Sequence, residues 1–319
     1  MSSLLLLGTA RRRPLRRAAG AVLLATLALA GCSTSPSDAT AGSPSGSTVI
    51  DVVAAENFWG SLAEQLGGTH VRVTSLIDNP DADPHDYEPT AADGRAIAAA
   101  KLVIVNGVGY DAWASKLVDA NPSSTRSVLT VGDLVGVKDG DNPHRWYNPD
   151  NVRQVIDQIT ADYKKVDPAD AAFFDTQHAT VLSTNLKTYF GMISQVKAVY
   201  AGTPVGASES IFAMLSPALG LRLLTPAPFL TAISEGSDPA AADKATIDAQ
   251  LQSKQIAVYV YNSQNATPDV QAQVTEAKAA GIPVTTITET MTPAGASFQD
   301  WQVAQLDRLR QALAHASGK

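Results

Sequence analysis

The segment Pro168–Tyr200, PADAAFFDTQHATVLSTNLKTYFGMISQVKAVY, decides the fold that this sequence predicts. It contains no proline after its first residue, and its one glycine, Gly191, falls late. From position 182 onward, apolar residues recur in steps of four and three, which is the period of an α-helix. Asp167 is a suitable N-cap, with Pro168 in the first helical position. The segment therefore predicts a helix about 50 Å long.

A helix of that length exceeds what one small domain needs. One interpretation is a rigid spine that joins two lobes. The other is a pair of shorter helices broken near Gly191.

Strands and helices alternate on both sides of this segment. Strands are expected at 49–55, 71–76, 102–106 and 128–131 before it, and at 203–207, 256–261 and 284–288 after it. Helices are expected at 58–66, 90–100 and 151–163, and then at 211–219, 240–253, 269–280 and 298–314. Such alternation is typical of parallel sheets. We therefore expect an α/β fold of two α/β lobes, at 49–166 and 202–319, joined by one long rigid helix at 167–201.

Composition narrows the class of protein. Hydrophobic residues make up 45% and charged residues 17% of the 319 residues, so a folded core is expected. The net charge is −7; outside the first 31 residues 19 basic and 31 acidic residues remain, a net charge of −12. An acidic chain is a poor nucleic-acid platform, so we expect no nucleic-acid partner. A single cysteine excludes an intrachain disulfide and a multi-thiolate metal site.

The N-terminus has the order of an export signal. Five arginines precede the apolar run Ala18–Ala30, which has 13 residues, whereas a bilayer span needs about 20. The run ends in Leu29-Ala30-Gly31-Cys32, which resembles the bacterial lipobox, in which the cysteine becomes the lipidated first residue. Residues 1–31 are therefore expected to be a lipoprotein signal peptide. Residues 32–48, rich in Ser, Gly, Thr and Pro, are expected to be a flexible tether.

Two of the five histidines lie where a ligand is expected. His85 follows an expected strand and precedes a helix, and His144 also lies just before a helix. A proline precedes each of them and fixes the local backbone. Open α/β sheets bind ligands at the carboxyl ends of their strands, and neutral imidazole is a common metal ligand. From their spacing alone these histidines only suggest a metal site.

Two glutamates occupy comparable loops in the second half. Glu209 lies between an expected strand and a helix, and Glu289 directly follows a strand. Two imidazoles and two carboxylates would neutralise a divalent cation and ligate it without sulfur. For each glutamate alone, the alternative is a charge stabilised by a helix N-terminus.

Three parts of the chain resemble the zinc/manganese (TroA-like) solute-binding lipoproteins of bacterial ABC importers. They are DPHDYEPTAAD at 83–93, NPHRWYNPDNV at 142–152, and the SES and TET loops at 208–210 and 288–290. The second motif departs from the family pattern, because Asn142 and Asn148 replace acids. The third ligand position holds Glu209, where many zinc-binding members have histidine. The fourth holds Glu289, one methylene longer than the usual aspartate.

The resemblance implies a metal site in the cleft between the lobes. His85 and His144 would come from the N-terminal lobe, and Glu209 and Glu289 from the C-terminal lobe. The residues expected to orient these ligands are Tyr87, Glu88 and Trp146.

The resemblance also implies a role. The protein would be a monomer, lipid-anchored through Cys32 on the extracytoplasmic face of the cell membrane. It would deliver its cargo to an ABC permease with its ATPase and would not be an enzyme. Carboxylates favour manganese because they suit hard ions, but the affinity order of divalent ions favours zinc, so the cargo is Zn²⁺ or Mn²⁺.

Two other classes of function stay open. An extracytoplasmic metallohydrolase would need an open metal position and a general base, and no HExxH motif occurs. A receptor for a metal chelate or tetrapyrrole would need a wide apolar or aromatic cleft, and aromatic residues make up only 6% of the chain.

Overall fold

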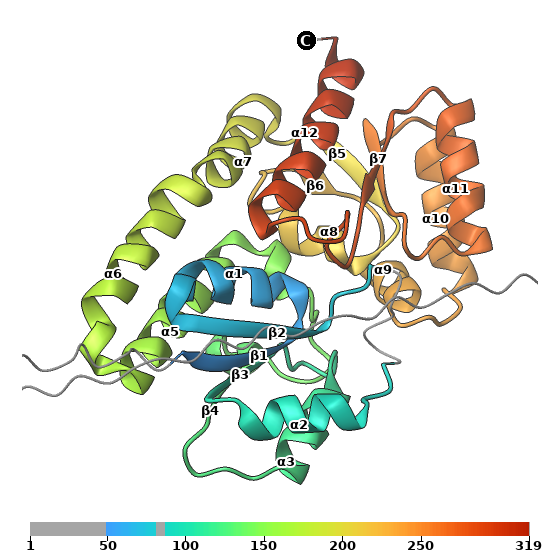
Figure 1. Ribbon diagram of the computed structural model, residues 1–319. Coiled ribbons are helices and arrows are strands. Elements are labelled where there is room, and N and C mark those ends of the chain that lie inside the picture. The colour runs from blue at the N-terminus through green and yellow to red at the C-terminus, as the bar shows by residue number, and fades with distance from the viewer. Residues whose placement is uncertain (1–48, 81–86, 319) are drawn as a thin grey trace, which may run out of the picture. The chain divides into compact units, whose positions relative to one another are not determined.

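The structure is a computed structural model that describes residues 49–80 and 87–318. Within these residues the chain forms two four-stranded parallel sheets (Figure 1). The first sheet runs β2-β1-β3-β4 and contains β1 (Ile50–Glu56), β2 (Val71–Ile77), β3 (Leu102–Val105) and β4 (Ser127–Thr130). The second runs β6-β5-β7-β8 and contains β5 (Pro204–Ala207), β6 (Arg222–Leu223), β7 (Val258–Asn262) and β8 (Val284–Ile287). The expected α/β fold of two lobes is confirmed.

The two sheets share one topology. In each, the first strand lies inside the sheet, the second pairs on one side of it and the third on the other. The chain therefore reverses its direction of winding between β1 and β3, and again between β5 and β7. In open α/β sheets such a switch point, at the carboxyl ends of the strands, is where ligands bind.

Helices cover both faces of the first sheet. They are α1 (Asn57–Gly67), α2 (Ala91–Ala99), α3 (Ala112–Ala120), the short α4 (Val131–Leu134) and α5 (Pro149–Val166). Alternate residues of β1 point to opposite faces: Val52 packs in the core that contains α1 and α5, and Val53 packs in the core that contains α2 and α3. Because both faces are buried, the strand reads as a continuous apolar run.

The second sheet is covered in the same way. Its helices are α8 (Ser210–Leu215), α9 (Ala227–Ser234), α10 (Ala241–Gln252), α11 (Pro268–Ala279) and α12 (Phe298–Ser317). Residues of α9, α10 and α11 pack around Tyr259 of β7 on one face, while α8 and α12 pack with Val258 and Val260 on the other. The sequence analysis missed α3, α4, α9 and the two-residue strand β6, whose apolar patterns are short.

The long segment is helical with one interruption. It comprises a 3-10 turn (Pro168–Asp170), α6 (Ala171–Thr180), a π turn (Val181–Asn185) and α7 (Lys187–Tyr200). The N–H of Leu186 donates to the carbonyl of Val181 over 2.9 Å, a spacing of five residues that marks the π turn. Gly191 lies inside α7, so a break near Gly191 was the wrong expectation. Asp167 makes no side-chain capping bond, contrary to its expected role.

This segment connects the lobes, as expected. α6 packs against α1 and α5 of the first lobe, and α7 packs against α12 of the second. Where they meet, the amides of Gln65 and Gln299 exchange two hydrogen bonds of 3.0 Å, and Asn185 donates to the Gln65 oxygen over 2.9 Å. Side chains from α1, α12 and the π turn thus tie the two lobes to the connecting helix.

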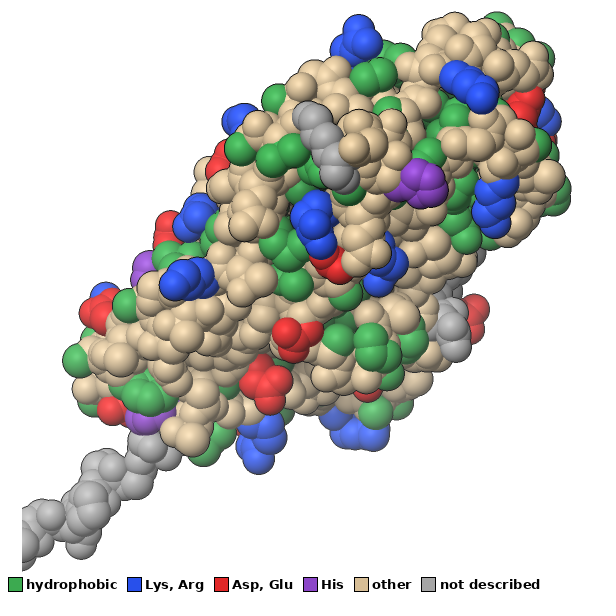
Figure 2. Space-filling model, turned by 90° about the horizontal axis from the view of Figure 1, so that it is seen from above, with side chains coloured by type: hydrophobic (Ala, Val, Ile, Leu, Met, Phe, Trp, Pro, Cys, Tyr) green, Lys and Arg blue, Asp and Glu red, His purple; other side chains and the backbone are tan. Residues whose placement is uncertain are grey.

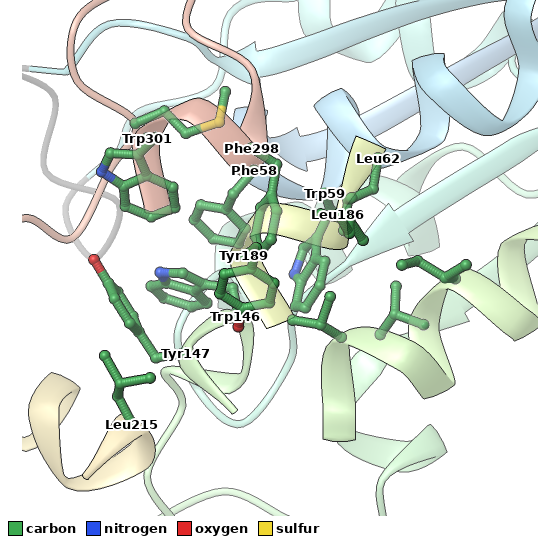
Figure 3. Packing of buried hydrophobic residues seen from close by; sticks show 14 of the residues in the cluster. Phe58, Trp59, Leu62, Trp146, Tyr147, Leu186, Tyr189, Leu215, Phe298 and Trp301 are labelled. Carbon is green, nitrogen blue, oxygen red and sulfur yellow. The ribbon is translucent and has the colours of Figure 1, made fainter. Parts of the chain in front are cut away.

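An aromatic core passes from one lobe to the other (Figure 3). Phe58 of α1 stacks on Trp146 at a centroid distance of 4.0 Å. The neighbouring Tyr147 meets Trp301 of α12 edge-on at 5.5 Å, and Trp301 packs edge-on against Phe298 at 6.1 Å. Because these rings are buried, wide separation of the lobes would expose them to water, which opposes a large hinge motion.

Among the described residues, no helix is both long and apolar enough to cross a bilayer. On the face seen in Figure 2, Lys and Arg side chains lie scattered among Asp and Glu side chains rather than gathered in one patch.

A buried carboxyl pair lies at the switch point of the first sheet. Asp111 accepts hydrogen bonds of 2.7 Å from the backbone N–H groups of Asn106 and Gly107. Burial, and then the charge of Asp111, raise the pKa of the Glu56 carboxyl well above its ordinary value of 4.5. Glu56, the last residue of β1, is fully buried. Burial also raises the pKa of Asp111, which the hydrogen bonds from Asn106 and Gly107 oppose. Glu56 therefore holds its proton, while Asp111 fixes the loop after β3 through those two bonds.

We predict that Glu56→Gln stabilises the metal-free protein at alkaline pH. A carboxyl whose pKa is raised by folding loses stabilisation as the pH climbs above its unfolded value, here 4.5, toward the raised value. Glutamine cannot ionise and escapes this loss. We expect the unfolding temperature of the variant, relative to that of the wild type, to increase as the pH is raised from 5 to about 9. Glu64→Gln is the control, because Glu64 is exposed. A Glu56→Gln variant whose unfolding temperature falls relative to that of the wild type as the pH rises would contradict the raised pKa of Glu56.

Candidate metal centre

His144 is fixed by its own loop and by the facing lobe. Its side chain is 1% exposed, and its Nδ1 lies 2.9 Å from Asn142 Oδ1 and 3.3 Å from Ser210 Oγ. An amide oxygen only accepts, so Nδ1 carries the proton and donates. In the neutral imidazole Nε2 then keeps its lone pair and is the atom through which the ring would bind a metal.

The loop that carries His144 is anchored on both sides. The amide of Asn106, at the end of β3, donates to the carbonyl of Pro143 over 3.0 Å. The amide of Asn142 donates to the carbonyl of Ser210, the first residue of α8, over 2.7 Å. His144 is therefore held between the switch point of the first sheet and the first helix after β5.

Glu209 lies at the switch point of the second sheet. It follows β5, is 2% exposed, and its Oε2 accepts a hydrogen bond of 3.0 Å from Asn262 Nδ2 at the end of β7. It occupies the N-cap position of α8 but makes no side-chain capping bond. The alternative of a charge stabilised by a helix N-terminus therefore fits the position of Glu209, although the side chain does not cap the helix by a hydrogen bond.

Glu289 follows β8 and faces the histidine. Its Oε1 lies 3.6 Å from His144 Nε2, and its side chain is 15% exposed. The Tyr110 hydroxyl also interacts with the Glu289 carboxylate, and burial raises the pKa of Tyr110 well above its ordinary range. Tyr110 is therefore a protonated donor beside this carboxylate.

The sequence analysis missed Tyr110, although its loop carried a signal. Gly107, Val108 and Gly109 all have left-handed backbones, with φ of 70°, 61° and 78°. For the β-branched Val108 this conformation is strained, and strain of this kind gathers at functional sites. The glycine pair matches the glycine-rich loop of dinucleotide-binding proteins only weakly. In the structure it turns the chain so that Tyr110 lies beside the Glu289 carboxylate.

The other expected residues are distributed as follows. His85 and Cys32 lie outside the described residues. Trp146 packs edge-on against the His144 ring at 5.2 Å. Tyr87 instead donates to Asp93 over 3.1 Å at the start of α2, and Glu88 is exposed.

A small pocket opens beside His144. It has a volume of about 250 Å³ and is lined in part by Tyr110, Asn142, His144, Ser210 and Glu235, from both lobes. Sites for drug-sized molecules usually occupy about 300 to 1,000 Å³. Neither Glu209 nor Glu289 lines it, so the pocket lies beside the expected ligands rather than among them.

A second group of possible ligands lies elsewhere. Among the described residues, His70, Asp167 and Asp170 have ligand atoms within 4.8 Å of one another, whereas His144, Glu209 and Glu289 are not such a compact set. However, His70 Nδ1 already pairs with Asp170 at 2.7 Å, and its ring packs on Phe173 at 4.0 Å. The group is partly exposed and has an ordinary structural explanation as an ion pair between the 3-10 turns that precede β2 and α6.

Sequence comparison identifies the family of this chain and several relatives. Residues 52–312 match the family described as ZnuA, zinc-uptake complex component A, periplasmic. The chain is 26% identical over 219 residues to the manganese ABC transporter substrate-binding lipoprotein PsaA of Streptococcus anginosus, covering 63% of this chain and 67% of that one. It is 27% identical over 176 residues to the manganese-binding lipoprotein MntA of Bacillus subtilis, covering 53% of each.

Solved structures share the fold. A Mn-bound periplasmic metal-binding protein from Candidatus Liberibacter asiaticus is similar with a TM-score of 0.68 at 20% identity, covering 82% of this chain and 98% of that one. A crystal structure of ZnuA is similar with a TM-score of 0.67 at 18% identity, covering 84% and 99%. The family match spans most of the chain. The chain therefore belongs to the ZnuA family and is a solute-binding protein rather than an enzyme.

Proposed function

We propose that this protein is the extracytoplasmic solute-binding component of an ABC importer and captures Zn²⁺ or Mn²⁺. Its ligands are His85, His144, Glu209 and Glu289. The observation that carries the proposal is the approach of His144 Nε2 to Glu289 Oε1, at 3.6 Å, across the two lobes. With Nδ1 engaged by Asn142, Nε2 and the carboxylate are the pair that a cation would bridge.

Electrostatics support a cation at this place. Glu209 and Glu289 are both withdrawn from water, and burying carboxylates is costly unless a positive charge lies near. A divalent ion supplies that charge. The ligand set of nitrogen and oxygen, without sulfur, suits zinc and manganese alike.

The bound ion is either Zn²⁺ or Mn²⁺, and different observations favour each. The matching family is named for zinc uptake, whereas PsaA and MntA are named for manganese. Two carboxylates favour the harder Mn²⁺, and the affinity order of divalent ions favours Zn²⁺.

The proposal extends to location and partners. Residues 1–31 act as a signal peptide, Cys32 carries the lipid, and residues 32–48 tether the folded part to the outer face of the cell membrane. Several relatives are named lipoproteins, which supports this arrangement. The folded monomer delivers its ion to a permease driven by an ATPase.

A receptor for a metal chelate or tetrapyrrole is the second candidate. It would need a wide apolar or aromatic cleft, and aromatic residues make up only 6% of the chain. The metallohydrolase is set aside by membership in a family of solute-binding proteins.

We predict that His85→Ala together with His144→Ala removes high-affinity metal binding. Losing two ligands of four should weaken binding by roughly 10⁴-fold or more, since four-ligand sites bind with about 10–16 kcal/mol in total. Calorimetric titration of the soluble part, residues 33–319, with Zn²⁺ and with Mn²⁺ measures this. The thermal stabilisation that metal confers on the wild type should disappear in parallel.

His70→Ala with Asp170→Ala is the matched control, because it removes the other His–Asp pair near possible ligands. This control should retain the wild-type affinity. If it loses binding while the His85, His144 variant keeps it, the metal centre lies elsewhere.

We also predict a role for Asn142. Asn142→Ala removes the acceptor that orients His144 and should weaken metal binding about tenfold to a hundredfold. Asn148→Ala is the control from the same motif: Asn148 accepts from the N–H groups of Asp150 and Asn151 and caps α5. It should cost about 1 kcal/mol of stability and leave affinity unchanged. Competition against a zinc chelator distinguishes the two, and equal effects would remove the special role of Asn142.

A further inference from the structure

We propose that Gln264 is a positioning residue that holds Glu289 in place and latches it to the N-terminal lobe, so that it slows release of the bound ion. This role rests on the proposed function, because it concerns the same metal centre. Gln264 lies in the loop after β7 and contacts both lobes through one side-chain amide.

The oxygen of this amide holds the Glu289 loop. Gln264 Oε1 accepts hydrogen bonds from the backbone N–H of Glu289 over 2.7 Å and from that of Thr290 over 3.0 Å. Two donors on consecutive residues fix the plane of the peptide between them. The direction in which the Glu289 side chain leaves the backbone is thereby set by Gln264.

The nitrogen of the same amide reaches the other lobe. Gln264 Nε2 donates to the carbonyl of Pro80 over 2.6 Å and to Thr290 Oγ1 over 2.7 Å. The hydroxyl of Thr290 donates in turn to the same Pro80 carbonyl over 3.1 Å. Pro80 belongs to the loop that follows β2, so one carbonyl of the first lobe receives two hydrogen bonds from the second.

The same loop also reaches the other carboxylate. The N–H of Gln264 donates to Asn262 Oδ1 over 2.9 Å, and Asn262 Nδ2 donates to Glu209 over 3.0 Å. One short segment after β7 therefore sets the positions of both glutamates. A displacement of Gln264 would shift Glu289 directly and would shift Glu209 through Asn262.

These contacts bear on release rather than on folding. The backbone and side chain of Gln264 are exposed, so replacing it leaves no cavity in the core. An ion bound between Glu289 and the N-terminal lobe leaves when those two parts separate. Hydrogen bonds that join them raise the barrier to that separation, and affinity differences within one site arise mostly in the dissociation rate.

The experiment measures the rate at which Zn²⁺ passes from the loaded protein to a chromogenic chelator in a stopped-flow instrument. Gln264→Met removes every hydrogen bond of the amide. Thr290→Val removes the two bonds of the hydroxyl, to Pro80 and from Gln264 Nε2, and leaves the bonds from the Glu289 and Thr290 N–H groups to Gln264 Oε1 in place. Gln299→Met is the matched control, because it also breaks a glutamine contact between the lobes, but beside the connecting helix. The unfolding temperature of each metal-free variant is measured alongside.

We expect Gln264→Met to release the ion about tenfold faster, which corresponds to a change of about 1.4 kcal/mol in the barrier. Thr290→Val should release it severalfold faster. Gln299→Met should release it at the wild-type rate, even where its unfolding temperature falls.

Release within twofold of the wild type in both Gln264→Met and Thr290→Val would overturn the proposal. Equal acceleration by Gln299→Met would also overturn it, because general loosening of the lobes would then explain the effect. A wild-type protein that takes up neither Zn²⁺ nor Mn²⁺ would instead contradict the proposed function itself, and this role with it.

Discussion

The structure depends on one apolar core that the two lobes share. Phe58 and Trp146 from the first lobe, and Phe298 and Trp301 from the second, form a continuous set of buried rings with Tyr147. Separating the lobes would expose this aromatic surface, which is costly in water. The lobes are therefore held at a nearly constant distance, and any adjustment on binding has to be a small rocking or a loop rearrangement. This constraint distinguishes the protein from receptors that close around a ligand by a wide hinge.

Against that fixed frame, the polar groups of the centre are held by hydrogen bonds at the carboxyl ends of the strands. Asn106 directly follows β3 and anchors the His144 loop, and Asn262 is the last residue of β7 and binds Glu209. The two sheets have the same strand order, so each lobe presents an asparagine at its own switch point. A site assembled from two such points gains ligands from both lobes without either sheet being deformed. Ligands held by rigid elements of this kind are positioned with less freedom than ligands on unsupported loops.

Most of the fold could be predicted from the sequence, because long apolar strands and helices have a strong periodicity. It located β1, β3 and the long helical segment to within one or two residues, and it placed His144 before a helix. It could not locate the interruption of that segment at Leu186, since a π turn depends on packing against both lobes rather than on glycine. It also missed Tyr110 and Gln264, because both act through tertiary contacts and the glycine pair before Tyr110 does not indicate what that tyrosine contacts.

The most direct test is an anomalous-scattering map of the protein crystallised with Zn²⁺ or Mn²⁺ and recorded at the absorption edge of that metal. The account predicts one dominant peak within bonding distance, about 2.0–2.2 Å, of His144 Nε2 and of carboxylate oxygens from Glu209 and Glu289. A dominant peak at His70, Asp167 and Asp170, with none at His144, would contradict it.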